Sequence, residues 1–295
     1  MDNQEKHIQL NGKFGGISFA LLMAFYLLIS LVFQAIAGVI FEKNSAGYLA
    51  VCSLSSVTAI CVTLCFAKNR TKTPVKQLVN LQTLGGVNNL LSLVLSAGMF
   101  LGLGLVNTVI AELLIKAGLN AGGISLPLNN VWQLVLFAIT VAILPAVFEE
   151  LFFRGLLLTC LSKTGSISSI LLSSLCFAIY HGSLSQFLYQ FIYGVALGFL
   201  AYNSKSVLPS IICHFINNFA VLLLTYLKVA VNLISPILLI IGINLLAFFG
   251  TACYFIFRKQ EKLKKQKGEV YNFFLPFGIF GFILCLTLII GNLFI

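Results

Sequence analysis

Length and composition exclude an ordinary soluble domain. The chain has 295 residues, of which 59% are hydrophobic and only 9% charged, so it must use the lipid bilayer as its solvent. Its net charge of +10 does not indicate nucleic-acid binding, because the basic residues fall in short loops between apolar runs, where they set orientation and contact anionic lipid.

The apolar runs are long and continuous, which is typical of membrane helices and not of the short alternating strands of a membrane barrel. The predicted fold class is therefore all-α, a polytopic transmembrane helix bundle of about eight or nine spans. In chain order, the spans are predicted at residues 17–40, 46–67, 88–115, 131–160, 166–181, 184–203, 207–227, 233–257 and 271–294. The fifth is short, and His181-Gly182-Ser183 leaves almost no loop before the sixth.

These spans divide into three predicted regions. The N-terminal spans occupy 1–130, a central region with polar residues inside its helices occupies 131–228, and C-terminal spans with a basic cytoplasmic loop occupy 229–295. If the N-terminus is cytoplasmic, 14 Lys and Arg residues fall inside and 3 fall outside. This asymmetry favours a multi-pass protein of the cell membrane in that orientation, because basic residues in short loops resist translocation.

Polar and ionisable residues cluster in the central region. An ionisable side chain inside a span costs at least a few kcal/mol, so such residues pair, line a cavity or take part in function. The candidates are Glu149, Glu150 and Arg154 in the fourth span, His181 at the end of the fifth, and His214 and Asn218 in the seventh. At about 1.5 Å per helical residue from the flanking lysines, Glu149, His181, His214 and Asn218 reach similar depths, so we expect them to meet.

Helical spacing separates the two glutamates. Glu150 and Arg154 are four residues apart on one helix face, which predicts an ion pair that neutralises both charges in the membrane. Glu149 points about 100° away from that face and lacks this partner. The ion pair is therefore interpreted as structural support, which leaves Glu149 for another role.

The seventh span presents a second polar face. His214 and Asn218 are four residues apart and point to one side, whereas Asn217, the competing amide, faces about 100° away from Asn218. Cys213 precedes His214 directly, but adjacent helix positions diverge, so the two make a poor nucleophile pair. The eight cysteines of the chain are interpreted as small hydrophobic residues, because no CxxC pair is present.

Together these residue types suit the hydrolysis of a carbonyl compound. A carboxylate beside a histidine can activate water, since the carboxylate takes the proton while the imidazole orients the water or passes the proton on. A second histidine and an amide can donate hydrogen bonds to a developing oxyanion.

Three motifs, in this order, resemble those of a known family. "EELFFRG" at 149–155, "FAIYH" at 177–181 and "HFINN" at 214–218 are similar to the motifs of the CAAX protease and bacteriocin-processing family, also called the Abi or type II CAAX prenyl endopeptidase family. The resemblance covers about residues 140–222. It implies an intramembrane endopeptidase of the glutamic type, which needs no metal or other cofactor.

The resemblance also implies roles and partners. The water activators would be Glu149 and His181, the oxyanion donors His214 and Asn218, and the supporting residues Glu150 and Arg154. The expected partners are the lipid bilayer and a peptide or lipidated-protein substrate, either a prenylated protein or a bacteriocin-type peptide.

Two other readings stay open at the level of sequence. Two histidines and a carboxylate also suit catalytic zinc, with Glu149, His181 and His214 as ligands, although the chain has no HExxH motif. From a different class of protein, a non-catalytic immunity or scaffold protein, or a proton-coupled transporter, could use the same polar cluster as a relay.

Overall fold

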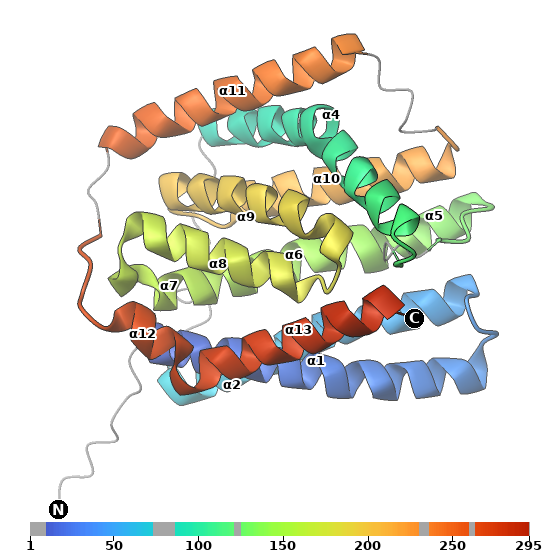
Figure 1. Ribbon diagram of the computed structural model, residues 1–295, viewed down its shortest axis with the longest axis horizontal. Coiled ribbons are helices and arrows are strands. Elements are labelled where there is room, and N and C mark those ends of the chain that lie inside the picture. Colours follow the sequence, from blue (N-terminus) through green and yellow to red (C-terminus); the bar gives the residue numbers. More distant parts are fainter. Residues whose placement is uncertain (1–9, 73–85, 121–124, 230–235, 260–262, 295) are drawn as a thin grey trace, which may run out of the picture.

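The apolar segments fold as helices that run side by side along one common direction (Figure 1). The computed structural model describes residues 10–72, 86–120, 125–229, 236–259 and 263–294. These ranges contain helices and turns and no strand, so the predicted all-α bundle is confirmed.

The helices follow the predicted spans closely. Three precede the central region: α1 (Gly12–Ile40), α2 (Ala46–Thr71) and α4 (Gly86–Lys116). The next crossing joins α5 (Val131–Phe137), η1 (Ala138–Ile143), α6 (Leu144–Glu150), η2 (Leu151–Leu157) and α7 (Leu158–Cys160). After η3 (Ser162–Thr164) come α8 (Ser166–Tyr180), α9 (Leu184–Ser204) and α10 (Leu208–Tyr226). The last described helices are α11 (Pro236–Lys259), α12 (Glu269–Phe273), η5 (Phe274–Gly278) and α13 (Ile279–Phe294).

Eight helices within the described ranges are long and apolar enough to cross a membrane. The exception among the nine predicted spans is α8, which has 15 residues and is about 22 Å long. That is shorter than a hydrocarbon core of about 30 Å. The chain therefore turns back into α9 before it has crossed the full thickness of the bundle, as Figure 1 shows.

Local sequence signals start several of the helices. The side-chain oxygens of Asn11, Ser45 and Asn130 each accept a hydrogen bond from the backbone N–H three residues later. These residues satisfy one of the N–H groups that every helix start leaves unpaired. Pro145 acts differently, because it lies inside a continuous helical rod, just after a π-helical segment, and has no N–H to donate.

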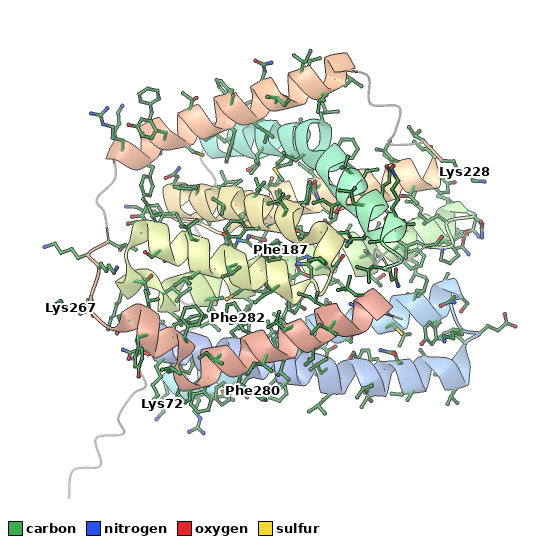
Figure 2. All side chains as sticks on the ribbon, viewed as in Figure 1. Lys72, Phe187, Lys228, Lys267, Phe280 and Phe282 are labelled. Atoms are coloured by element: carbon green, nitrogen blue, oxygen red, sulfur yellow. The ribbon has the colours of Figure 1, made fainter. Side chains whose placement is uncertain are left out.

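Basic residues gather at one end of the bundle. The start of α1, the end of α2, the turn between α7 and α8, the end of α9 and the residues 263–268 before α12 all lie there (Figure 1). Lys72 and Lys267 mark this basic end in Figure 2, and Lys228 marks the opposite end, which we call the Lys228 end. Backbone hydrogen bonds join these turns: Gln266 donates its N–H to the carbonyl of Lys163 at 2.9 Å.

Close helix packing depends on glycines where two backbones meet. Gly194 and Gly198 of α9 face Ser174 and Ile170 of α8, where a Cβ would crowd both neighbours. Gly242 of α11 presses against the backbone of α4 in the same way. Small residues of this kind let membrane helices approach closely enough for van der Waals contact to hold them.

The contact between α4 and α11 generates a stability prediction. A side chain at Gly242 would collide with the main chain of Leu101 and Gly102, which cannot move aside as a flexible side chain can. We expect Gly242→Val to lower the free energy of unfolding by about 1–3 kcal/mol through overpacking. The midpoint of thermal unfolding in detergent should fall accordingly. Gly250→Val on the same helix is the matched control, because nothing lies within 4 Å of a Cβ there. Equal unfolding midpoints for the two variants would contradict this packing.

Candidate functional site

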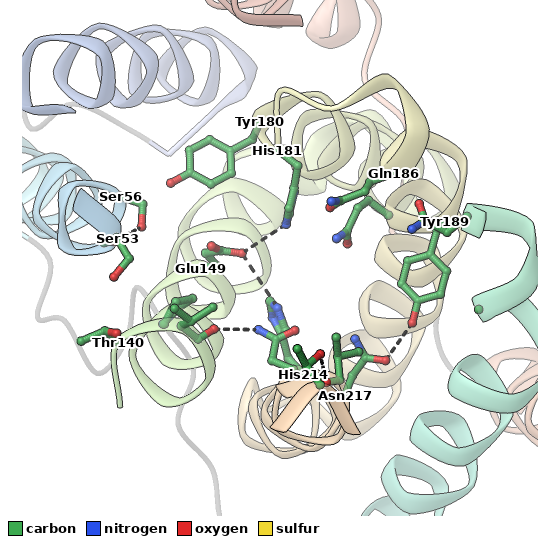
Figure 3. Close-up of a pocket in the computed structure, with 18 of the residues that line it drawn as sticks. Ser53, Ser56, Thr140, Glu149, Tyr180, His181, Gln186, Tyr189, His214 and Asn217 are labelled. Carbon is green, nitrogen blue, oxygen red and sulfur yellow. Dashed lines mark hydrogen bonds and ion pairs between the residues drawn. The ribbon is translucent and has the colours of Figure 1, made fainter. Parts of the chain in front are cut away.

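A cavity of about 660 Å³ lies inside the bundle, enclosed by α2, α4, α6, α9 and α10 (Figure 3). Most of the side chains that line it carry a polar atom, in contrast to the apolar composition of the chain. All four residues predicted to meet line this cavity: Glu149, His181, His214 and Asn218. A cavity of this size with several polar groups in its wall has room for water and for part of a substrate.

Glu149 lies between the two histidines. Its Oε2 is 3.9 Å from Nε2 of His181 and 4.0 Å from Nε2 of His214. That oxygen is buried and has no hydrogen-bond partner. Both distances are too long for a direct hydrogen bond, but one water at about 2.8 Å from each atom spans such a gap. The separation of Glu149 from each histidine therefore matches that of two groups bridged by one water.

The backbone fixes the tautomer of neutral His181. Its Nδ1 is 2.7 Å from the carbonyl oxygen of Phe177, one helical turn earlier. A carbonyl only accepts, so Nδ1 carries the hydrogen, and Nε2 presents a lone pair toward Glu149. His181 can therefore accept a proton or a hydrogen bond from a water held beside the carboxylate.

Glu150 joins the ion pair to the second histidine. Its Oε1 accepts a hydrogen bond from Nη1 of Arg154 at 2.8 Å, as the spacing of four residues predicts. The same oxygen is 3.0 Å from Nδ1 of His214 on α10. The carboxylate therefore fixes the orientation of the His214 ring and directs its Nε2 into the cavity. Sequence patterns do not reveal this contact, because the two residues are 64 positions apart.

Arg154 is held by three different partners. Besides Glu150, its guanidinium donates to the carbonyl oxygen of Gly194 at 3.1 Å, and its Cζ lies 4.2 Å from the centre of the Phe177 ring. The Phe177 ring also packs edge-on against both His181 and His214. Phe177 is therefore the hydrophobic surface on which the arginine and both histidines rest.

The two asparagines of α10 both line the cavity. Asn218 donates from Nδ2 to the carbonyl oxygen of Val141 at 3.4 Å. Pro145, four residues after Val141, lacks the N–H that would bond to that carbonyl in a regular helix. Asn217 instead accepts a hydrogen bond from the hydroxyl of Tyr189 at 2.7 Å. As expected from their helix positions, the two amides contact different helices, Asn217 through Tyr189 and Asn218 through Val141. Both side chains nevertheless line the same cavity.

The donor atoms can be compared with a zinc site. Tetrahedral zinc with bonds of about 2.0–2.1 Å brings its ligand atoms to about 3.3–3.4 Å from one another. The separations of 3.9 and 4.0 Å from Glu149 to the two histidines are longer. In the part of the chain that the structure describes, no group of three or more His, Cys, Asp or Glu residues is arranged to hold a metal ion. The observed arrangement suits a water better than a zinc ion.

The walls of the cavity come from outside the motifs. Ser53 and Ser56 of α2 face Glu149 from one side, and Gln186 and Tyr189 of α9 lie on the other side (Figure 3). Sequence reasoning gave these residues no role. The signal that could have drawn attention to α2 is "CSLSS" at 52–56, a run of hydroxyl side chains inside an apolar span.

One comparison with known proteins finds a match to part of the chain. Residues 130–220 match the family model described as type II CAAX prenyl endopeptidase Rce1-like. The match covers the helices that carry all of the predicted site residues and leaves the N-terminal and C-terminal helices outside. No curated protein and no solved structure matches the chain.

The buried ion pair generates a stability prediction. Removing one member leaves the other charge unpaired inside the bundle, so Glu150→Gln or Arg154→Gln alone should destabilise the fold by about 3–5 kcal/mol. The double variant should lose less than the sum of the two single losses, because no charge is left unpaired. Thermal or denaturant unfolding of the four proteins of the cycle measures this coupling, and strictly additive losses would count against the pair.

Proposed function

We propose that this member of the type II CAAX prenyl endopeptidase Rce1-like family is an intramembrane endopeptidase that hydrolyses a peptide bond of a membrane-associated substrate. The observation that carries the proposal is the unpartnered Oε2 of Glu149, which lies one water away from the Nε2 atoms of two histidines. A buried carboxylate oxygen without a partner is costly to keep, and here it belongs to a residue that lines the cavity. Such an atom is well placed to act on water.

In the proposed mechanism, Glu149 and His181 activate the water. The water donates one hydrogen bond to the Glu149 carboxylate and one to the lone pair on Nε2 of His181, which orients an oxygen lone pair toward the substrate carbonyl. As the oxygen attacks the carbonyl carbon, Glu149 takes the proton. The tetrahedral intermediate then carries the negative charge on the former carbonyl oxygen.

His214 and Asn218 stabilise that oxyanion. Because Nδ1 of His214 donates to Glu150, donation from Nε2 requires the protonated imidazolium, and the Glu150 carboxylate balances its charge. Asn218 has a second N–H on Nδ2 beyond the one directed at Val141, and this hydrogen is free to point at the oxyanion. Collapse of the intermediate breaks the C–N bond, and the proton held by Glu149 passes to the leaving amine.

The substrate class and the membrane orientation complete the proposal. The family description favours a peptide or lipidated protein at the membrane, which includes a prenylated C-terminal segment and a bacteriocin-type peptide. The gathering of basic residues at one end supports a cytoplasmic position for the basic end and for the N-terminus, in the cell membrane.

Loss of water activation is the first test. Glu149→Gln keeps the size of the side chain but cannot take the proton, and His181→Ala removes the group that orients the water. Each should lower kcat for cleavage of a membrane-associated peptide by about 10²- to 10⁴-fold. Glu112→Gln, at an exposed position of α4, is the matched control and should leave the rate unchanged.

Three outcomes would contradict this mechanism. Full cleavage by Glu149→Gln would remove the carboxylate from the chemistry, and a biological effect such as self-immunity that survives in this variant would favour a non-catalytic role. Stoichiometric zinc in the purified protein, with activity lost on chelation and regained with zinc, would favour the metalloprotease reading. We expect activity to persist in chelator.

Alanine variants of the two asparagines test which of them donates a hydrogen bond to the oxyanion. Asn218→Ala should lower kcat by about 10²- to 10³-fold, because one donor to the oxyanion is lost. Asn217→Ala should act mainly on KM, since its amide is already bonded to Tyr189 at the cavity wall. Asn244→Ala, exposed on α11, serves as the control. If Asn217→Ala lowers kcat more than Asn218→Ala does, the assignment of the donor is wrong.

A further inference from the structure

We infer that Asn292, in the last turn of α13, is a positioning residue for His181. Its side chain holds the turn that follows His181, and through that turn it keeps the imidazole ring in the orientation that presents Nε2 to Glu149. The effect on the rate rests on the proposed function, whereas the effect on the ring can be measured without catalysis. The family match ends at residue 220 and assigns nothing to α13.

Gly182 ends α8 directly after the histidine. The helix ends at Tyr180, and the N–H of Gly182 closes the last turn onto the carbonyl of Ile179 at 3.1 Å. Gly182 has a φ of +63°, in the left-handed region that glycine enters at little cost and that commonly ends helices. The chain then enters α9 at Leu184. The backbone of His181 is therefore held on one side by α8 and on the other by a turn of very few residues.

Asn292 gives this turn a partner from a distant helix. Its Nδ2 donates to the carbonyl oxygen of Gly182 at 2.8 Å, across 110 positions of sequence, where the end of α13 meets the end of α8 (Figure 1). A Cβ on Gly182 would lie 3.3 Å from that Nδ2 and 3.6 Å from Cβ of Leu288, so the two side chains cover the turn closely. Gly182 is buried, and a buried carbonyl needs a protein donor because water does not reach it. Asn292 supplies that donor.

The last turn of α13 is itself anchored by another helix end. The carbonyl of Leu293 accepts a hydrogen bond from the N–H of Asn120, just after α4, at 3.0 Å. Helix ends fray unless their terminal backbone groups find partners. This second contact opposes fraying, so Asn292 presents its amide to Gly182 from a backbone that is held in place.

Loosening of the turn would act on the ring of His181. The Nδ1 atom is bonded to the carbonyl of Phe177 at 2.7 Å, and the ring packs edge-on against the Phe177 ring with centres 4.6 Å apart. Both contacts depend on the helical backbone of His181, which the last residue of a fraying helix loses. Without the carbonyl, the neutral ring can carry its hydrogen on Nε2 instead. Such a ring presents a donor toward Glu149 and cannot accept a hydrogen bond from the water.

The ring can be observed directly by nuclear magnetic resonance of the full-length protein in detergent, labelled with ¹⁵N-histidine. The chain has 3 histidines, and His181→Ala identifies the signals of His181 by their loss. At alkaline pH, where a free imidazole is neutral, the nitrogen shifts distinguish hydrogen on Nδ1 from hydrogen on Nε2. We expect hydrogen on Nδ1 in the wild type. In Asn292→Leu, which has a similar size but no donor, we expect a mixture of both forms.

Two further variants sharpen this measurement. Gly182→Ala disturbs the same turn from its other side, because a Cβ is strained at this φ, and should give the same mixture. Thr287→Val is the matched control on α13, since its exposed hydroxyl bonds only within its own helix, to the carbonyl of Leu284. Its ring signals should equal those of the wild type. Wild-type ring signals in Asn292→Leu or Gly182→Ala, or the mixture in Thr287→Val, would overturn the inference.

The rate separates this inference from the proposed function. Asn292→Leu should lower kcat for cleavage of a membrane-associated peptide by about 3- to 10-fold, as expected for one lost neutral hydrogen bond, with KM within about twofold of the wild type. A lower kcat with unchanged ring signals would overturn the positioning role. Changed ring signals with an unchanged rate would leave Asn292 as the residue that orients His181 and would remove His181 from the proposed mechanism.

Discussion

A charge inside a bilayer has to be balanced by the protein itself, and Glu150 is where this chain does so. One carboxylate oxygen accepts from Arg154 at 2.8 Å and lies 3.0 Å from Nδ1 of His214. Through these contacts α6, η2 and α10 are tied together, and Arg154 extends the link to α9 through the carbonyl of Gly194. Burial makes the network expensive to break, so the ring of His214 keeps one orientation.

This network also separates the surroundings of two adjacent glutamates. Each glutamate has one buried oxygen without a hydrogen-bond partner. Glu150 is fully buried and contacts Arg154 and His214 through its other oxygen, whereas Glu149 lines the cavity. Because Arg154 neutralises Glu150, the bundle can hold a second carboxyl group beside it without two unbalanced negative charges. In the proposed mechanism Glu150 supports the site and Glu149 activates water, and the two residues differ in the direction in which the helix points them.

Several features of the site could be predicted because they depend on one helix at a time. The ion pair of Glu150 and Arg154 follows from spacing alone, and the convergence of Glu149, His181 and His214 follows from depth along helices that share a membrane. The contact of Glu150 with His214 depends on how two helices are rotated about their axes, which neither spacing nor depth specifies. The hydroxyl wall of α2 depends on a tertiary contact between distant helices, for which a single sequence carries only the serine-rich run at 52–56 as a hint.

The clasp between the first and last helices has a consequence for how the protein is made. Gly12 of α1 donates its N–H to the side chain of Glu269, 257 residues later in the chain, and α1 packs along α12, η5 and α13. Tyr26 of α1 lines the cavity near Tyr180, with ring centres 5.5 Å apart. During synthesis α1 therefore waits in the bilayer with one face open to lipid until α13 has been inserted. A chain that lacks α12, η5 and α13 leaves this face of α1 without its protein partner, although α1 still packs against α2.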